Sequence, residues 1–241
     1  LRLMASTSYN ERRSEIETYF DRTAADAWSA LTSDAPVSRI RQTVRAGRDE
    51  MRATLLSWLP EDLTGLRILD AGCGTGAFSV EAARRGANVV AIDLSPTLVE
   101  LARERQPTDL APGHIEFRVG DMASVEGESF DYVVAMDSVI HYDPHHAVEV
   151  LATLATSVRR GILFTFAPRT PLLAIMHAVG GLFPRGDRAP AIVPIGEKRL
   201  YGDLAGAPGL GDWERGRSHR VKSGFYTSQA CELRRREANS G

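Results

Sequence analysis

Between residues 65 and 167, short runs rich in β-branched and aromatic residues alternate with stretches of helical spacing. This alternation is typical of a parallel sheet whose strands are joined by crossover helices. Ser95-Pro96 and Asp143-Pro144 each combine a capping residue with a first-turn proline, so each is expected to start a helix. The expected strands are 67–71, 88–93, 115–120, 130–136 and 161–167, and the expected helices follow Gly76 or cover about 97–105 and 145–159.

The segment LDAGCGTGAF joins the first expected strand to the first expected helix. Glycines stand at alternate positions in it, whereas a dinucleotide-binding loop reads Gly-x-Gly-x-x-Gly. Glycine permits a positive φ and lets a ligand approach the backbone closely. A carboxylate at Asp70 would repel a phosphate but could hold an ammonium group, so the loop favours a cofactor with an amino-acid moiety. The loop residues expected to bind this cofactor are Asp70, Gly72, Cys73, Gly74, Thr75 and Gly76.

Acidic residues also follow the next two strands. Asp93 stands 17 residues beyond Gly76, where a carboxylate can accept hydrogen bonds from both hydroxyls of a ribose. Asp121 could accept a hydrogen bond from an adenine amino group, and Met122 could pack on the ring. A glycine turn that only packs a helix on a strand would not explain all three acids. The other cofactor-binding residues expected at strand ends are Leu94, Asp137 and Ser138.

This spacing of glycines and acids resembles the class I S-adenosylmethionine-dependent methyltransferases. The resemblance implies S-adenosylmethionine as methyl donor and a Rossmann-like α/β fold. Its sheet would have seven mostly parallel strands with helices on both faces, preceded by an N-terminal helical arm or lid. We expect the arm at 1–62 and the cofactor-binding domain at 63–241, with a substrate-covering insertion near 169–205.

The arm has the pattern of amphipathic helices. Ile16, Tyr19 and Phe20 begin one apolar repeat of helical spacing, and Val37 begins a second. The second helix also carries arginines along another face, so it is expected to have an apolar face and a basic face. Those arginines are Arg41, Arg45, Arg48 and Arg52. Further on, 171–182 is helix-like and apolar, and the last strands are expected to form a hairpin that turns at Ser223-Gly224.

Several segments resemble the magnesium-protoporphyrin O-methyltransferase family of the bacteriochlorophyll pathway. They are IETYFDRTAADAW, SRIRQTVRAGRDEMR, DAGCGTG, VVAMDSVIHYD and GFYTSQACELRR. The resemblance implies methyl transfer to one propionate carboxylate of magnesium protoporphyrin IX, with magnesium present only as part of this substrate. It also implies that His141 and Tyr19 form the catalytic pair.

A flat apolar porphyrin with an acidic rim suits a helix with one apolar and one basic face. We therefore expect Arg41, Arg45 or Arg48 to bind a substrate carboxylate. For any single arginine, a solvated basic face is the alternative.

His141 lies just beyond the fourth expected strand, where ligands bind in parallel α/β sheets. No protein metal site is expected, because a helix starts at Pro144, between His141 and His145, and zinc would need further ligands. A propionate, with a solution pKa of about 4 to 5, is already mostly ionised at neutral pH. His141 could therefore orient the carboxylate, or accept a proton if burial raises the carboxyl pKa.

Composition narrows the function classes. The 29 basic and 31 acidic residues give a net charge of −2, which does not favour binding to nucleic acid. Two cysteines are too few for a disulfide framework, so we expect a cytoplasmic protein. The family resemblance adds a peripheral position at photosynthetic membranes and, as a partner, the porphyrin-binding subunit of magnesium chelatase. The alternatives are a methyltransferase for another small acid or a quinone precursor, and a non-catalytic porphyrin carrier.

Overall fold

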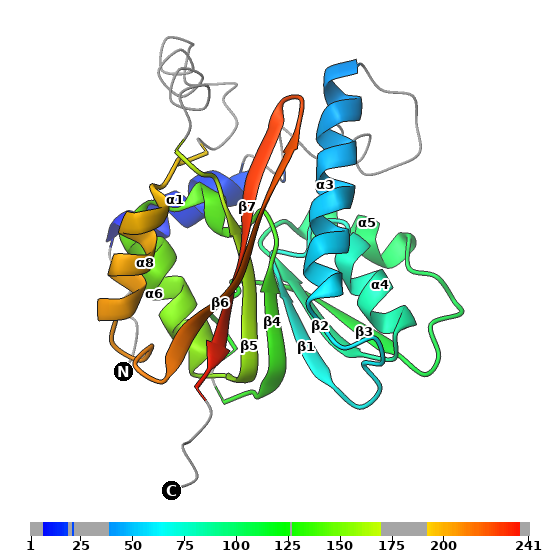
Figure 1. Cartoon of the computed structure of the whole chain (residues 1–241). Coiled ribbons are helices and arrows are strands. Elements are labelled where there is room, and N and C mark those ends of the chain that lie inside the picture. The colour runs from blue at the N-terminus through cyan, green and yellow to red at the C-terminus, as the bar shows by residue number, and fades with distance from the viewer. Residues whose placement is uncertain (1–6, 19–20, 22–38, 126, 170–191, 237–241) are drawn as a thin grey trace, which may run out of the picture.

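The computed structural model describes residues 7–18, 21, 39–125, 127–169 and 192–236 (Figure 1). Within these residues, one seven-stranded sheet has the strand order β3-β2-β1-β4-β5-β7-β6. The first five strands run parallel, and β7 is antiparallel to both of its neighbours, which confirms the expected fold class. The strands are β1 (Arg67–Ala71), β2 (Asn88–Asp93), β3 (His114–Val119), β4 (Phe130–Ala135), β5 (Val158–Phe166), β6 (Trp213–Ser223) and β7 (Tyr226–Arg235).

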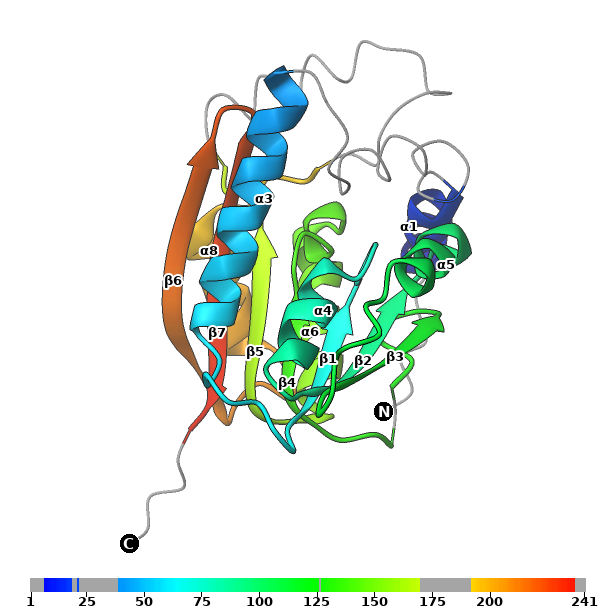
Figure 2. The same ribbon diagram turned by 90° about the vertical axis from the view of Figure 1, so that its right-hand side faces the viewer.

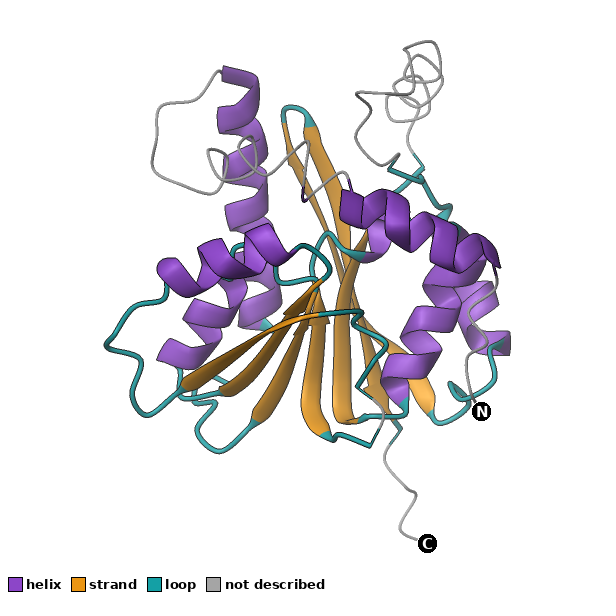
Figure 3. Cartoon of the chain, turned by 180° about the vertical axis from the view of Figure 1, so that it is seen from behind, coloured by secondary structure: helices purple, strands orange, loops and turns teal. Residues whose placement is uncertain are grey.

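Helices cover both faces of the sheet (Figures 1 and 3). One face carries α3 (Arg39–Ser57), α4 (Ala77–Arg84) and α5 (Pro96–Glu104), and the other carries α1 (Thr7–Thr18), α6 (Pro144–Ala155) and α8 (Glu197–Gly206). Each group buries apolar side chains on the sheet, for example Met51 and Leu55 of α3 and Leu151 of α6. No described helix is both long and apolar enough to cross a bilayer.

The predicted helix starts are confirmed by their caps. The Ser95 hydroxyl accepts a hydrogen bond from the Leu98 N–H at 3.2 Å, and Pro96 is the first residue of α5. The Asp143 carboxylate accepts from the N–H groups of His145 and His146 at the start of α6. These side chains satisfy N–H groups that have no partner within the helix.

The structure describes only part of the predicted insertion near 169–205. Residues 170–191, including the apolar segment 171–182, lie outside the described residues, as does most of the first apolar repeat of the arm. Helix α8 was not predicted; it buries Leu200 and Leu204 and packs against α6. The hairpin of β6 and β7 is confirmed, but its turn is at Gly224 and Phe225, one residue later than expected.

The order of the strands places a crevice at the carboxyl end of β1. The chain runs outward from β1 through β2 to β3 and then returns to β4 on the other side of β1 (Figure 2). Connections leave β1 and β4 in opposite directions, and ligands of open α/β sheets bind where the strand order reverses in this way.

Candidate active site

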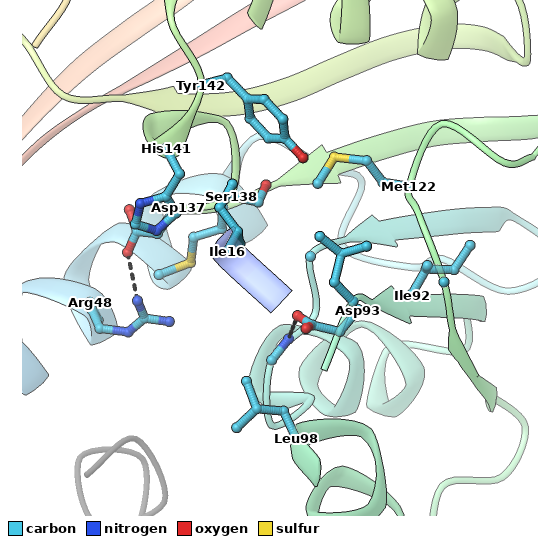
Figure 4. Close-up of a pocket in the computed structure, with 15 residues that line it drawn as sticks. Ile16, Arg48, Ile92, Asp93, Leu98, Met122, Asp137, Ser138, His141 and Tyr142 are labelled. Atoms are coloured by element: carbon cyan, nitrogen blue, oxygen red, sulfur yellow. Dashed lines mark hydrogen bonds and ion pairs between the residues drawn. The ribbon is translucent and has the colours of Figure 1, made fainter. Parts of the chain in front are cut away.

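A cleft lies at this reversal, at the carboxyl ends of β1 to β4 (Figure 4). It contains about 660 Å³ of space that is not filled by protein atoms, part of it open to solvent. Its wall includes Ile16 of α1, Arg48 of α3 and His141 of η2 (Val139–His141), a short 3₁₀ helix after β4. Its lining combines apolar side chains with a few polar groups, as is typical of ligand-binding sites.

The glycine loop forms one side of the cleft. The N–H groups of Gly72 and Cys73 donate to the Ile92 carbonyl at 2.8 and 3.0 Å, which fixes the loop against β2. The φ of Gly72 is 84°, and a Cβ atom at this position would lie 2.4 Å from Cβ of Ser138. Only glycine fits there, because such a φ is strained for other residues and the space is already filled.

The other residues of the glycine loop are packed against the protein interior. Gly76 is the N-cap residue of α4, with a φ of 78°, and lies against the ring of Phe117. Thr75 is buried. Burial and the nearby Asp93 raise the pKa of the Cys73 thiol well above its usual value, so the thiol stays neutral. A neutral thiol is a poor nucleophile, which agrees with a packing role for Cys73.

Asp70 lies beneath the loop and not on the wall of the cleft. Its carboxylate accepts a hydrogen bond from the Ser79 hydroxyl at 2.6 Å, and its side chain is almost wholly buried. Burial, together with the charge of Asp93, raises the pKa of Asp70 to about 7. The structure thus places Asp70 as a support for the loop, and its direct contact with an ammonium group stays a prediction.

Asp93 faces the cleft. Its two carboxylate oxygens accept from the N–H groups of Gly74 at 2.8 Å and Ser95 at 3.0 Å, while burial raises its pKa. Each carboxylate oxygen has two lone-pair sites, so Asp93 can still accept from the two hydroxyls of a ribose. Leu94 lies beside it on the wall.

Asp121 binds α1. Its carboxylate accepts from the Tyr9 hydroxyl at 3.0 and 3.1 Å and forms an ion pair with Arg13 at 3.5 Å. The Tyr9 ring stacks on Tyr142 with 5.7 Å between the ring centroids. Met122 does line the cleft as expected, but the contact of Asp121 with an adenine amino group stays a prediction.

Asp137 and Ser138 follow β4 and both line the cleft. The Asp137 carboxylate is paired with Arg48, whose Nη1 lies 2.8 Å from Oδ2. The Ser138 hydroxyl is buried and has no hydrogen-bond partner among the described residues. A buried hydroxyl without a partner costs about 1–3 kcal/mol, so a ligand in the cleft that bonds to it would be favoured.

The predicted catalytic and substrate-binding residues are only partly brought together. His141 lines the cleft, and its backbone carbonyl accepts from Nε of Arg12 at 2.8 Å. Tyr19 lies outside the described residues. Of the three arginines of α3 that were predicted to bind substrate, Arg48 lines the cleft, whereas Arg41 and Arg45 do not. No group of three or more His, Cys, Asp or Glu side chains that could hold a metal is found in the described ranges.

The cleft suits a nucleoside that carries an amino acid. It offers acidic oxygens at Asp93, backbone at Gly72 and Gly74, an apolar side chain at Met122 and the Ser138 hydroxyl, which lacks a partner among the described residues. Sequence reasoning did not find the contributions of Ile16, Met136 and Tyr142, whose apolar spacing indicates only burial. The hydrogen bonds of Tyr226 to Asp137 carried no sequence signal, because the two residues stand 89 positions apart.

Known proteins resemble this chain along most of its length. The family model described as "Magnesium-protoporphyrin IX methyltransferase C-terminus" matches residues 135–235, and "Methyltransferase domain" matches 68–161. The magnesium-protoporphyrin O-methyltransferase of Rhodobacter capsulatus is 48% identical over 229 residues, covering 95% of this chain and 99% of that protein. The protein of that name from Synechocystis is 30% identical over 220 residues, covering 90% and 94%.

A solved structure resembles the chain equally broadly. It is magnesium protoporphyrin IX methyltransferase from Synechocystis with bound SAH, which covers 92% of this chain and 99% of that one. The two are 29% identical, and the TM-score is 0.80. The similarity therefore extends over most of both chains.

Proposed function

The chain belongs to the magnesium-protoporphyrin O-methyltransferase family, and we infer that it transfers a methyl group from S-adenosylmethionine to one propionate carboxylate of magnesium protoporphyrin IX. The products are the monomethyl ester and S-adenosylhomocysteine (SAH), and the reaction belongs to bacteriochlorophyll biosynthesis. The observation that carries this conclusion is the 48% identity to the Rhodobacter enzyme across 95% of the chain.

The residues of the cleft divide the work of holding the cofactor. Asp93 would accept from the ribose hydroxyls, Met122 would pack on the adenine, and the backbone at Gly72 and Gly74 would lie against the amino-acid moiety. Ser138 would contribute its buried hydroxyl. When bound, the cofactor supplies a methyl group on a positively charged sulfur.

The main task of the remaining residues is to align the acceptor carboxylate. An ionised carboxylate needs no strong base, and orientation alone can supply several kcal/mol of the barrier reduction. His141 stands at the rim of the cleft, where its backbone is held by Arg12, and would orient the reacting oxygen by a hydrogen bond. Tyr19 is the second proposed catalytic residue.

Arginines of α3 would bind the acidic parts of the ligands. Arg48 reaches the cleft and is the strongest candidate for a carboxylate in it. Arg41 and Arg45 lie nearer the N-terminus of the same helix and do not line the cleft. They would contact the rim of the porphyrin.

The decisive experiment offers the purified protein S-adenosylmethionine labelled on the methyl group, with magnesium protoporphyrin or metal-free protoporphyrin. Chromatography and mass spectrometry then identify the product. We expect labelled monomethyl ester from magnesium protoporphyrin. Label in neither porphyrin would contradict the proposed function, and binding of both ligands without ester would favour a carrier. Quinone precursors and other small acids in parallel reactions test the remaining alternative.

We further propose that the porphyrin is delivered by the porphyrin-binding subunit of magnesium chelatase, and that the protein associates peripherally with photosynthetic membranes. Both proposals rest on the family resemblance, and the poor solubility expected of a large apolar macrocycle supports direct transfer over release. Co-sedimentation with photosynthetic membrane vesicles, with and without that subunit loaded with porphyrin, tests them. Absence of the protein from both pellets, with no faster esterification from the loaded subunit, would contradict them.

A further inference from the structure

The carboxylate of Asp137 is held from three other elements. Beside the ion pair with Arg48 of α3, it accepts from the Tyr226 hydroxyl of β7 at 3.0 and 3.1 Å and from the Thr165 hydroxyl of β5 at 3.2 Å. The Ser228 hydroxyl lies 3.4 Å away. A carboxylate has about four lone-pair sites, so these protein donors account for its capacity. Asp137 therefore serves as an internal anchor, and its contact with the cofactor stays a prediction.

The backbone at Asp137 is also unusual. Its φ is 53°, and Asp137 is the only residue other than glycine in the described ranges with a positive φ. Such residues cost free energy and persist where surrounding contacts hold them, often at functional sites. Here the Asp137 N–H donates to the Thr165 hydroxyl at 2.7 Å, so both the backbone and the side chain are fixed.

Tyr226 is fixed in turn by close packing against α3. A Cβ atom on Gly47 would lie 2.5–2.8 Å from the Tyr226 side chain, so the helix backbone touches the ring directly. Thr43, one turn before Gly47 on α3, makes a second close contact with the hairpin: a Cβ atom on Gly224 would lie 2.6 Å from the Thr43 side chain. Burial and the charge of Asp137 raise the pKa of the Tyr226 hydroxyl, which therefore stays protonated and donates.

These contacts form a chain that ends in the cleft. The ring of Tyr226 lies on Gly47, and its hydroxyl lies within hydrogen-bond distance of both oxygens of Asp137. Asp137 in turn accepts from Nη1 of Arg48, as Figure 4 shows. Arg48 has a planar guanidinium that can bind a carboxylate with two parallel hydrogen bonds, but only if the plane is correctly oriented.

We propose that Tyr226 and Asp137 are positioning residues that hold the Arg48 guanidinium as the carboxylate-binding group of the cleft. The inference rests on the proposed function. Both ligands of the reaction carry a carboxylate, the cofactor on its amino-acid end and the porphyrin on its propionates. The chemistry recognised is the same, and measurements on each ligand separate the two sources.

The test uses Tyr226→Phe, which keeps the ring against Gly47 and removes only the hydroxyl. Calorimetry gives the dissociation constant of SAH, and initial rates give the KM for magnesium protoporphyrin and kcat. We expect one of the two ligand constants to rise about tenfold, as for loss of one charge-assisted hydrogen bond, while kcat changes less than twofold. A rise in the SAH constant assigns Arg48 to the cofactor, and a rise in the porphyrin KM assigns it to the substrate.

The matched control is Tyr201→Phe. The Tyr201 hydroxyl lies 2.7 Å from Sγ of Cys231, on the α8 side of the sheet, and its loss should leave both ligand constants unchanged. Comparable losses in the two variants would mean that the effect of Tyr226→Phe is general destabilisation, and would overturn the proposal.

A double-mutant cycle distinguishes positioning of Arg48 by Tyr226 from a purely structural role of Tyr226. Arg48→Gln removes the guanidinium but leaves a donor for Asp137. If Tyr226 acts through Arg48, adding Tyr226→Phe to Arg48→Gln causes no further loss of affinity. Additive losses would overturn the inference, as would unchanged ligand constants in Tyr226→Phe. The calorimetric constant does not depend on turnover, so failure of the proposed function would show separately, as absence of ester from the wild-type protein.

Discussion

Three acidic residues at equivalent strand ends have different partners in the folded chain. Asp70 is bonded to a hydroxyl beneath the glycine loop, Asp93 to two backbone N–H groups, and Asp121 to side chains of α1. The spacing in the sequence predicted that all three would gather near one edge of the sheet. It could not predict the partners of Asp121, because Tyr9 and Arg13 stand more than 100 positions away and only the tertiary fold brings them close.

The pKa of Asp70 gives the ligand-free protein a particular pH dependence. The folded-state pKa is about 7, whereas an aspartate in an unfolded chain titrates near about 3.9. The folded chain therefore binds this proton more tightly. The stability that the protonated group contributes is fully present below about pH 4 and is lost as the pH rises through about 7.

Asp70→Asn should remove this dependence, because asparagine keeps the shape and can still accept from Ser79. Between pH 5 and 8, the free energy of unfolding of the wild type should fall relative to that of the variant by up to about 3 kcal/mol. Urea unfolding of both proteins without ligand measures this difference. Parallel curves across that range would show that the carboxyl group is not protonated in the folded protein.

His141→Ala should lower turnover about 100-fold, because the reacting carboxylate loses its orientation, while the affinity for SAH changes less than twofold. Tyr19→Phe is expected to act in the same direction. His145→Ala is the matched control, since the His145 side chain is 79% exposed on α6 and pairs with Glu149. Rate assays and calorimetry give the two quantities, and a large loss of SAH affinity in His141→Ala would place His141 in the cofactor site instead.

At the scale of elements, the sequence predicted the strands well, because alternation and turn residues are local signals. β1 and β2 have the expected bounds, and β3 and β4 differ by one residue. Helix α8 was missed because its few apolar residues follow a segment rich in proline and glycine. The contact between α3 and the hairpin could not be predicted either, since it depends on Gly47 meeting Tyr226 across the fold.

Gly47→Ala tests that contact. Alanine in a helix interior is normally more favourable than glycine by about 1 kcal/mol, but here the added methyl group meets the Tyr226 ring at 2.5 Å. We therefore expect Gly47→Ala to lower the free energy of unfolding, by about 1–3 kcal/mol. Gly202→Ala on α8, with no atom within 4 Å, should raise it by up to about 1 kcal/mol. Urea unfolding gives the free energy of unfolding of both variants. If both substitutions raised it, the close contact between α3 and Tyr226 would be able to relax at little cost.

At the scale of the whole molecule, the cleft is lined by residues at the carboxyl ends of four strands and by residues of α1 and α3. Ligand binding should therefore stabilise the fold as a unit, by about 2.7 kcal/mol when SAH is at 100 times its dissociation constant. Asp93→Ala should abolish this gain, because Asp93 both faces the ligand and fixes Gly74.

The control for this measurement is Asp62→Ala, which also removes an acceptor of a backbone N–H, that of Thr64, but lies outside the cleft. It should keep the full response to SAH. Chemical denaturation of each variant with and without SAH gives the response, and an undiminished gain in Asp93→Ala would remove Asp93 from the ligand site.

The two outermost strands of the sheet, β3 and β6, each have one edge without a neighbouring strand in the described fold. Open edges of this kind can pair with other chains and start aggregation. Both strands are rich in charge: β3 carries Glu116 and Arg118, and β6 carries Arg220 and Lys222 among others. A second copy that approached either edge would have to desolvate these charges. These charges therefore protect the sheet against joining edge to edge with the sheet of a second copy.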